Sequence, residues 1–152
     1  MPELGSRGEG WVALQVALIA ALVRAGFAGE RQRSPLGRGL GIALLPAGAS
    51  LVWAGFRELG PSLTPLPRPR EDAELAEVGI YGRVRHPIYG GLVLGACGFS
   101  LVRERPGALR RTAALALLLV LKARREEAWL LERYPGYAAY VERTPRRFWP
   151  AA

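Results

Sequence analysis

Two long stretches without charged residues constrain most strongly how this chain can fold. Residues 39–56 form 18 consecutive uncharged and mostly apolar positions, and residues 86–102 are uncharged apart from one histidine. A helix rises about 1.5 Å per residue, so 18 residues reach the lower end of the length that crosses a bilayer. A soluble amphipathic helix would show a polar face every 3.6 residues, and neither stretch does. The pattern predicts a helical integral membrane protein.

Two further apolar segments give an all-α bundle of about four transmembrane helices in a single domain of 152 residues. The predicted spans are residues 11–29, 39–56, 88–102 and 108–123. The last is the weakest, because its fully apolar part, residues 112–121, covers only about 15 Å. Residues 57–87 are then a connector between the second and third spans, and residues 124–152 are a helical tail outside the membrane. Gly90, Gly91, Gly95 and Gly98 predict close packing of the third span against a neighbour.

The basic character of the chain fits a membrane protein better than a nucleic-acid-binding protein. The formal net charge is +8, and Lys122 is the only lysine among 21 basic residues. The arginines lie at the ends of apolar stretches, where guanidinium groups reach lipid headgroups. No aromatic-basic alternation or zinc-ligand spacing accompanies them, and the single Cys97 allows no disulfide framework. We therefore expect a lipid bilayer as partner, no nucleic acid and no metal site.

The arrangement of four spans predicts which parts of the chain share one side of the membrane. The N-terminus, the connector and the tail lie together, and they carry 13 lysines and arginines against seven in the two opposite loops. The side richer in basic residues is usually the cytoplasmic one. We expect a bacterial inner-membrane protein whose connector and tail meet on the cytoplasmic face.

The most reactive residue types gather in residues 79–89, GIYGRVRHPIY, which hold the only histidine of the chain. Pro87 favours the first turn of a helix. Arg85, His86 and the phenols of Tyr81 and Tyr89 would therefore gather at a helix N-terminus. The positive end of the helix dipole favours a carboxylate or another anion there.

The pattern G-x-Y-x-x-x-R-H-P-x-Y resembles the cofactor motif of the isoprenylcysteine carboxyl methyltransferase and phospholipid methyltransferase superfamily. The paired Glu126 and Glu127, followed by G-Y-x-x-Y-x-x-R at residues 136–143, are similar to the C-terminal signature of the same superfamily. Residues 66–69 also resemble the connector that precedes the histidine motif. The resemblance covers about residues 57–150. Ile80 departs from it, because the family often has proline at this position.

This resemblance implies a membrane-embedded methyltransferase that uses S-adenosylmethionine and acts on a lipophilic small-molecule or prenylated acceptor, such as the carboxylate of an isoprenylcysteine-like compound. A catalytic role falls to Glu127 and to Arg143, which would hold an acidic acceptor. Cofactor binding falls to Tyr81, Arg85, His86, Pro87, Tyr89, Glu126 and Tyr140. We expect Arg146 and Arg147 to contact headgroups, and Phe148 and Trp149 to anchor the tail in lipid.

Three alternatives remain open at this point. A phospholipid or other lipid amine could be the acceptor, in which case a glutamate would help remove a proton. The sterol reductases have a related C-terminal architecture but use NADPH, and no 2′-phosphate site is evident in this sequence. A non-catalytic membrane protein of the same fold would bind no cofactor.

Overall fold

The computed structural model describes residues 4–60, 64–66 and 75–150. The described residues form five α-helices and one 3₁₀ helix, with no strand among them, so the all-α prediction is confirmed. The elements are α1 (Glu9–Ala25), α2 (Pro35–Leu59), η2 (Gly79–Gly82), α3 (Pro87–Arg103), α4 (Pro106–Arg133) and α5 (Tyr137–Arg143). Part of the predicted connector motif, residues 67–69, lies outside the described residues.

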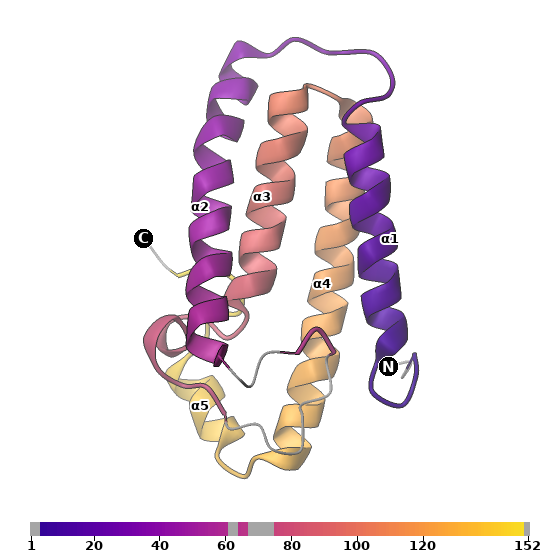
Figure 1. Cartoon of the computed structure of the whole chain (residues 1–152). Helices are drawn as coiled ribbons and strands as arrows, with labels where there is room; N and C mark the ends of the chain where they lie inside the picture. Colours follow the sequence, from indigo (N-terminus) through magenta and orange to yellow (C-terminus); the bar gives the residue numbers. More distant parts are fainter. Residues whose placement is uncertain (1–3, 61–63, 67–74, 151–152) are drawn as a thin grey trace.

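The four long helices run side by side, with alternating direction along the chain (Figure 1). Helix α1 packs on α4, α4 on α3, and α3 on α2, so α1 and α2 form the two outer edges. The N-terminal end of α1, η2 and α5 lie at one end of the bundle, and the loop between α1 and α2 lies at the other. The histidine motif and the tail therefore meet at the same end, as two intervening helices require.

Proline and serine residues set the helix starts. Pro35, Pro87 and Pro106 each lie in the first turn of a helix, where the missing N–H leaves no intrahelical bond unmade. Ser34 caps α2 by accepting a hydrogen bond from the Gly37 N–H at 3.1 Å. The first predicted span was too long: α1 ends at Ala25, because the backbone leaves the helix at Gly26 instead of continuing to residue 29.

Glycines bring the backbones of α2 and α3 into contact. The buried residues of α2 are Gly41, Gly48 and Gly55, seven positions apart. A Cβ atom at Gly48 would lie 2.7 Å from the carbonyl oxygen of Gly91 on α3. No side chain larger than hydrogen fits there, so the predicted close packing of the α3 glycines is confirmed at Gly91.

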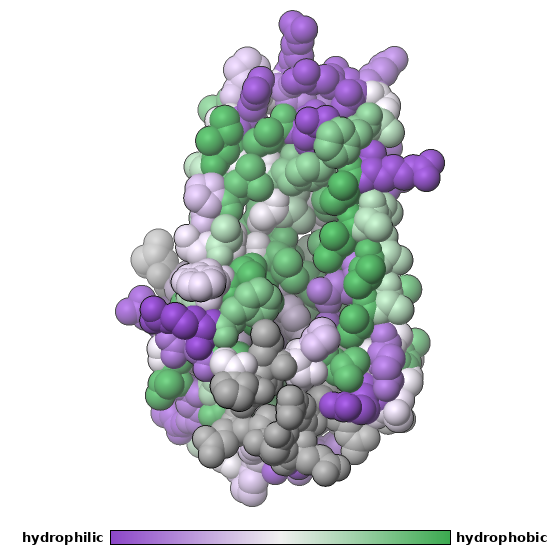
Figure 2. Space-filling view, in the orientation of Figure 1, coloured by the Kyte–Doolittle hydropathy of each residue, from purple (hydrophilic) through white to green (hydrophobic). Residues whose placement is uncertain are grey.

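Apolar side chains cover much of the outer surface. Among the described residues, α2 is the one helix long and apolar enough to cross a membrane, and α3 is apolar but shorter. Figure 2 shows hydrophobic residues along the helices and hydrophilic ones at the end that carries the loop between α1 and α2. The exposed apolar residues of α2 include Leu36, Leu40, Ile42, Leu45 and Trp53. An apolar surface of this extent is unusual on a soluble monomer.

Candidate functional site

A pocket of about 410 Å³ lies at the end of the bundle that holds η2 and α5. All four long helices contribute to its wall, together with residues 64–66 and 75–76, η2 and α5. The other lining residues are mainly aliphatic, and the polar or aromatic ones are Gln15, Phe56, Thr64, Tyr81, Arg85, His86, Tyr89, Lys122, Glu126, Tyr134, Tyr137 and Tyr140. The volume and the mixture of an apolar wall with a few polar groups are typical of a small-molecule site.

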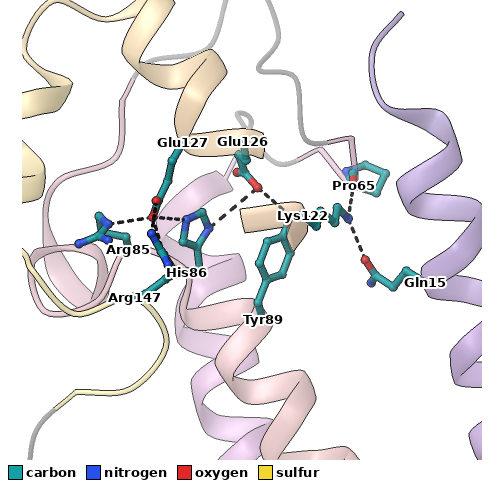
Figure 3. Close-up of polar contacts among 9 residues, drawn as sticks. All are labelled: Gln15, Pro65, Arg85, His86, Tyr89, Lys122, Glu126, Glu127 and Arg147. Carbon is teal, nitrogen blue, oxygen red and sulfur yellow. Dashed lines mark hydrogen bonds and ion pairs between the residues drawn. The ribbon is translucent and has the colours of Figure 1, made fainter. Parts of the chain in front are cut away.

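His86 lies at the start of α3, immediately before Pro87. Its ring stacks on Tyr89, one turn further along, with the ring centroids 5.3 Å apart and the planes 4° from parallel. The Nε2 atom lies 3.1 Å from Glu127 Oε1, and the Nδ1 atom lies 3.9 Å from Glu126 Oε2. Glu126 and Glu127 of α4 therefore face the same imidazole from opposite sides (Figure 3).

Glu127 binds three basic side chains from segments far apart in the sequence. Its Oε1 accepts hydrogen bonds from Arg85 Nε and Arg147 Nε, both at 3.0 Å, and its Oε2 accepts one from Arg147 Nη2 at 2.6 Å. The carboxylate does not line the pocket. From behind the lining, Glu127 holds Arg85 and His86 on the pocket wall, because both side chains hydrogen-bond to its Oε1 atom.

The electrostatics of this cluster keep the Glu127 side chain ionised. Burial alone would raise the pKa of Glu127, but hydrogen bonds from His86, Arg147 and Arg85 hold this pKa well below its usual range. The hydrogen bond with Glu127 in turn raises the pKa of the Arg147 guanidinium. A carboxylate with so low a pKa is a weak proton acceptor near neutral pH.

The C-terminal segment completes the cluster, and this corrects two expectations. Arg147 was predicted to contact headgroups, yet it forms the bidentate pair with Glu127. Phe148 was predicted to anchor the tail in lipid, yet it is buried with its ring against His86. The backbone N–H groups of Arg85 and His86 donate to the carbonyls of Arg146 and Arg147 at 3.0 and 2.7 Å. These N–H groups are therefore used within the fold and do not face a ligand.

Glu126 lies on the pocket side of α4. Its Oε2 accepts a hydrogen bond from the Tyr89 hydroxyl at 2.7 Å, and about a quarter of the side chain is exposed. The two adjacent glutamates therefore differ in environment: Glu126 faces the pocket, whereas Glu127 faces the arginines.

Tyrosines of η2 and α5 also line the pocket. The Tyr140 hydroxyl donates to the backbone carbonyl of Tyr81 at 2.8 Å, which joins α5 to η2. Burial raises the pKa of Tyr140 to about 12, and it also raises the pKa values of Tyr81 and Tyr137. All three phenols stay protonated at neutral pH, so they can donate hydrogen bonds.

Seven residues predicted to bind cofactor came from two separate motifs, and six of them line this one pocket: Tyr81, Arg85, His86, Tyr89, Glu126 and Tyr140. Pro87 starts α3 and is buried outside the lining. Arg143 also lies outside it, with 60% of its side chain exposed and its Nη2 atom 2.6 Å from Glu77 Oε2. The structure thus brings the predicted cofactor residues together and places Glu127 in contact with two of them outside the pocket lining, whereas Arg143 lies apart.

Sequence reasoning missed two pocket residues on the side of α1. Lys122, at the end of the last predicted span, is only 1% exposed and donates to Gln15 Oε1 at 2.8 Å and to the Pro65 carbonyl at 3.0 Å (Figure 3). A signal for both was present. Lys122 is the only lysine, and Gln15 is the only uncharged polar residue in the first apolar stretch.

The part of the chain that the structure describes holds no group of three or more histidine, cysteine or acidic side chains placed to bind a metal ion. A sequence model described as phospholipid methyltransferase matches residues 36–136, which include α2, the histidine motif and the glutamate pair. The cobalt-zinc-cadmium resistance protein CzcN of Cupriavidus metallidurans is 35% identical over 83 residues. That match covers 52% of this chain and 37% of the relative, so the chain spans little more than a third of CzcN.

Proposed function

The chain belongs to the phospholipid methyltransferase family, within the isoprenylcysteine carboxyl methyltransferase-like superfamily, and from this premise we propose that it is a membrane-embedded, S-adenosylmethionine-dependent methyltransferase acting on a lipophilic acceptor. The observation that carries the proposal is the meeting of the two motifs. Residues 81–89 and residues 126–140 lie far apart in the sequence, yet both segments line one pocket and contact each other there through the Tyr89–Glu126 and Tyr140–Tyr81 hydrogen bonds.

The chemistry of the pocket residues fits this cofactor. The Glu126 carboxylate suits an ammonium group, and the aromatic rings of the lining, such as those of Tyr81 and Tyr137, suit a positively charged sulfur. The Tyr137 hydroxyl lies in the wall, is buried, and has no hydrogen-bond partner among the described residues. Such a group is costly unless a ligand or water supplies a partner. When bound, S-adenosylmethionine would supply the methyl group. As an acceptor atom forms its bond to the methyl carbon, the carbon–sulfur bond breaks and its electron pair stays on the sulfur.

The residues of the pocket would act mainly by orientation and exclusion of water. Glu127 fixes Arg85 and His86, and the C-terminal segment covers them from outside. Methyl transfer to a carboxylate needs no base, so positioning supplies most of the rate enhancement. A lipid amine, the alternative acceptor, would have to lose a proton, and Glu126 is the carboxylate that faces the pocket.

An acceptor with an apolar tail has a route from the bilayer. Helices α1 and α2 form the two outer edges of the bundle. Both contribute to the pocket lining, α1 through Gln15 and α2 through Phe56 and Leu59. The pocket therefore reaches the edges that face lipid if the helices cross the membrane. The exposed apolar surface of α2 supports such a crossing.

The proposal includes four membrane spans, formed by α1 to α4, with the pocket on the cytoplasmic side. The count of basic residues supports this orientation. Cysteines introduced at positions 6, 34, 107 and 146 test it by accessibility labelling. Positions 6 and 146 should label from one side and positions 34 and 107 from the other, and labelling of 6 and 146 from opposite sides would contradict the arrangement.

Binding of radiolabelled S-adenosylmethionine to purified protein in lipid nanodiscs is the direct test, followed by incubation with a membrane lipid extract and identification of any labelled product. His86→Gln should weaken cofactor binding by about 1–3 kcal/mol, because the cofactor wall loses the ring that joins the two glutamates. Absence of saturable binding to the unaltered protein, or preferential binding of NADPH, would overturn the proposal.

A further inference from the structure

Among the described residues, a buried cation whose hydrogen bonds go only to neutral oxygens lies on the α1 side of the pocket. Lys122 lies on α4, one turn before Glu126, and is nearly fully buried. Its ammonium group donates to the neutral oxygens of Gln15 and Pro65, and it lies 5.1 Å from the centroid of the Tyr89 ring. Among the described residues, no carboxylate lies within ion-pair distance of it. A buried charge held only by neutral groups is costly for the fold.

Within residues 4–60, 64–66 and 75–150, the donors of this corner are not all used. An ammonium group carries three N–H donors, and two of them are taken by Gln15 and Pro65. Lysine can only donate, so the Gln15 amide must turn its oxygen toward Lys122 and its NH₂ group away from it. Both side chains line the pocket. The corner therefore offers donors from two side chains, one of them an ammonium group.

From this geometry we infer that Lys122 and Gln15 form a binding site for the anionic group of the lipid acceptor, a carboxylate or a phosphate. The inference rests on the proposed function, because it names the class of acceptor that the methyltransferase pocket takes. Lys122 is a compact charge that fits a buried corner. An ionisable residue at this depth of an apolar bundle is costly, and a ligand anion would offset that cost.

The site also assigns a direction to the pocket. Glu126 and His86 lie toward α5, and Lys122 and Gln15 lie toward α1 (Figure 3). An acceptor bound through its anionic group at Lys122 would place its apolar tail along the apolar wall that includes Phe56 and Leu59. A lipid amine without an anionic group would meet the Lys122 charge and be repelled.

The test measures binding of radiolabelled oleate to the protein in phosphatidylcholine nanodiscs, with oleyl phosphate, methyl oleate and oleylamine as competitors. Lys122→Met keeps the length of the side chain and removes its charge, and it should weaken oleate binding at least about tenfold. Arg124→Met is the matched control, since Arg124 is an exposed arginine on the same helix, and it should bind oleate normally. Oleyl phosphate should compete, and oleylamine should not. The stronger competitor among oleate and oleyl phosphate identifies the anionic group.

A second variant tests the same site without removing the lysine. Gln15→Glu keeps the contact with Lys122 but supplies a resident carboxylate, so it should exclude oleate while the protein stays folded. Thermal unfolding in nanodiscs without added oleate should show both variants at least as stable as the unaltered protein. Normal oleate binding in Lys122→Met or Gln15→Glu, or equal competition by oleylamine, would overturn the inference.

The two proposals fail in different measurements. Lost oleate binding in Lys122→Met with normal S-adenosylmethionine binding supports the anionic site. Normal S-adenosylmethionine binding and transfer to lipid, with oleate binding unaffected by either variant, overturns the site and leaves the methyltransferase proposal standing. Oleate binding that depends on Lys122, without any S-adenosylmethionine binding, overturns the methyltransferase proposal instead.

Discussion

Lys122 and Glu127 are two buried ionisable residues five positions apart on α4, and they differ in whether their partners are charged or neutral. Glu127 receives four hydrogen bonds from Arg85, His86 and Arg147, so its charge is compensated inside the protein. Among the described residues, Lys122 donates hydrogen bonds only to neutral oxygens. The difference indicates that Glu127 organises the site, whereas Lys122 is available to a ligand.

Removing Glu127 should have the largest effect on stability. Glu127→Ala leaves Arg85 and Arg147 buried or half-buried without their shared partner, and loss of one member of a buried ion pair costs about 3–5 kcal/mol. Unfolding by denaturant in detergent measures this free energy. Glu132→Ala, an exposed glutamate on the same helix, is the control and should change little. Equal effects of the two substitutions would remove the distinction drawn between Glu127 and Lys122.

Adjacent arginines of the tail offer a matched pair. Arg147→Gln should destabilise the protein by about 1–3 kcal/mol, because a charged hydrogen-bonded partner of Glu127 is lost. Arg146→Gln should remain within about 0.5 kcal/mol, since the side chain is exposed.

A second measurement separates positioning from bulk stability. The chain has one histidine, so the ring ¹⁵N signals of His86 can be assigned without ambiguity. These signals should shift in Arg147→Gln and stay in place in Arg146→Gln, because His86 and Arg147 bind the same carboxylate. Unshifted signals in Arg147→Gln would show that Arg147 does not position the ring.

A smaller loss is expected where the tail joins η2. Tyr140→Phe removes the hydrogen bond from the phenol to the Tyr81 carbonyl and should cost about 1 kcal/mol. The same unfolding measurement applies. Tyr137→Phe is the counterpart, since the Tyr137 hydroxyl has no partner among the described residues, and it should not destabilise the protein without ligand. A larger loss for Tyr137→Phe than for Tyr140→Phe would contradict the assigned contacts.

The smallest effect over the ordinary pH range comes from titration of Glu127. Its pKa is lower in the folded protein than in the unfolded chain, so its stabilising contribution is fully present above the unfolded value of about 4.3. The contribution is lost as pH falls from there through the folded pKa. Unfolding at pH 7 and at pH 3.5 should show a smaller acid-induced loss in Glu127→Gln than in the unaltered protein, and an equal loss would contradict the low pKa.

The sequence alone determined the helical class, the approximate positions of the four long helices, and the family. Uncharged apolar stretches and prolines at helix starts are local properties, so Pro35, Pro87 and Pro106 mark α2, α3 and α4 directly. The histidine motif and the C-terminal signature also identified six of the residues that line the pocket. The end of α1 was misplaced, because an apolar sequence continues beyond the residue at which the backbone leaves the helix.

Only the tertiary structure decided which face each charged residue takes. Glu126 and Glu127 are adjacent and chemically alike, and the rotation of about 100° between neighbouring helical positions sends one toward the pocket and the other toward the arginines. Arg143, Arg146 and Arg147 were likewise indistinguishable by composition, but the segment after α5 turns back along residues 85–86 and delivers Arg147 alone to Glu127. Lys122 acquired its partners from α1 and from residue 65, both far away in sequence. Such contacts depend on how the helices pack, which local sequence patterns do not specify.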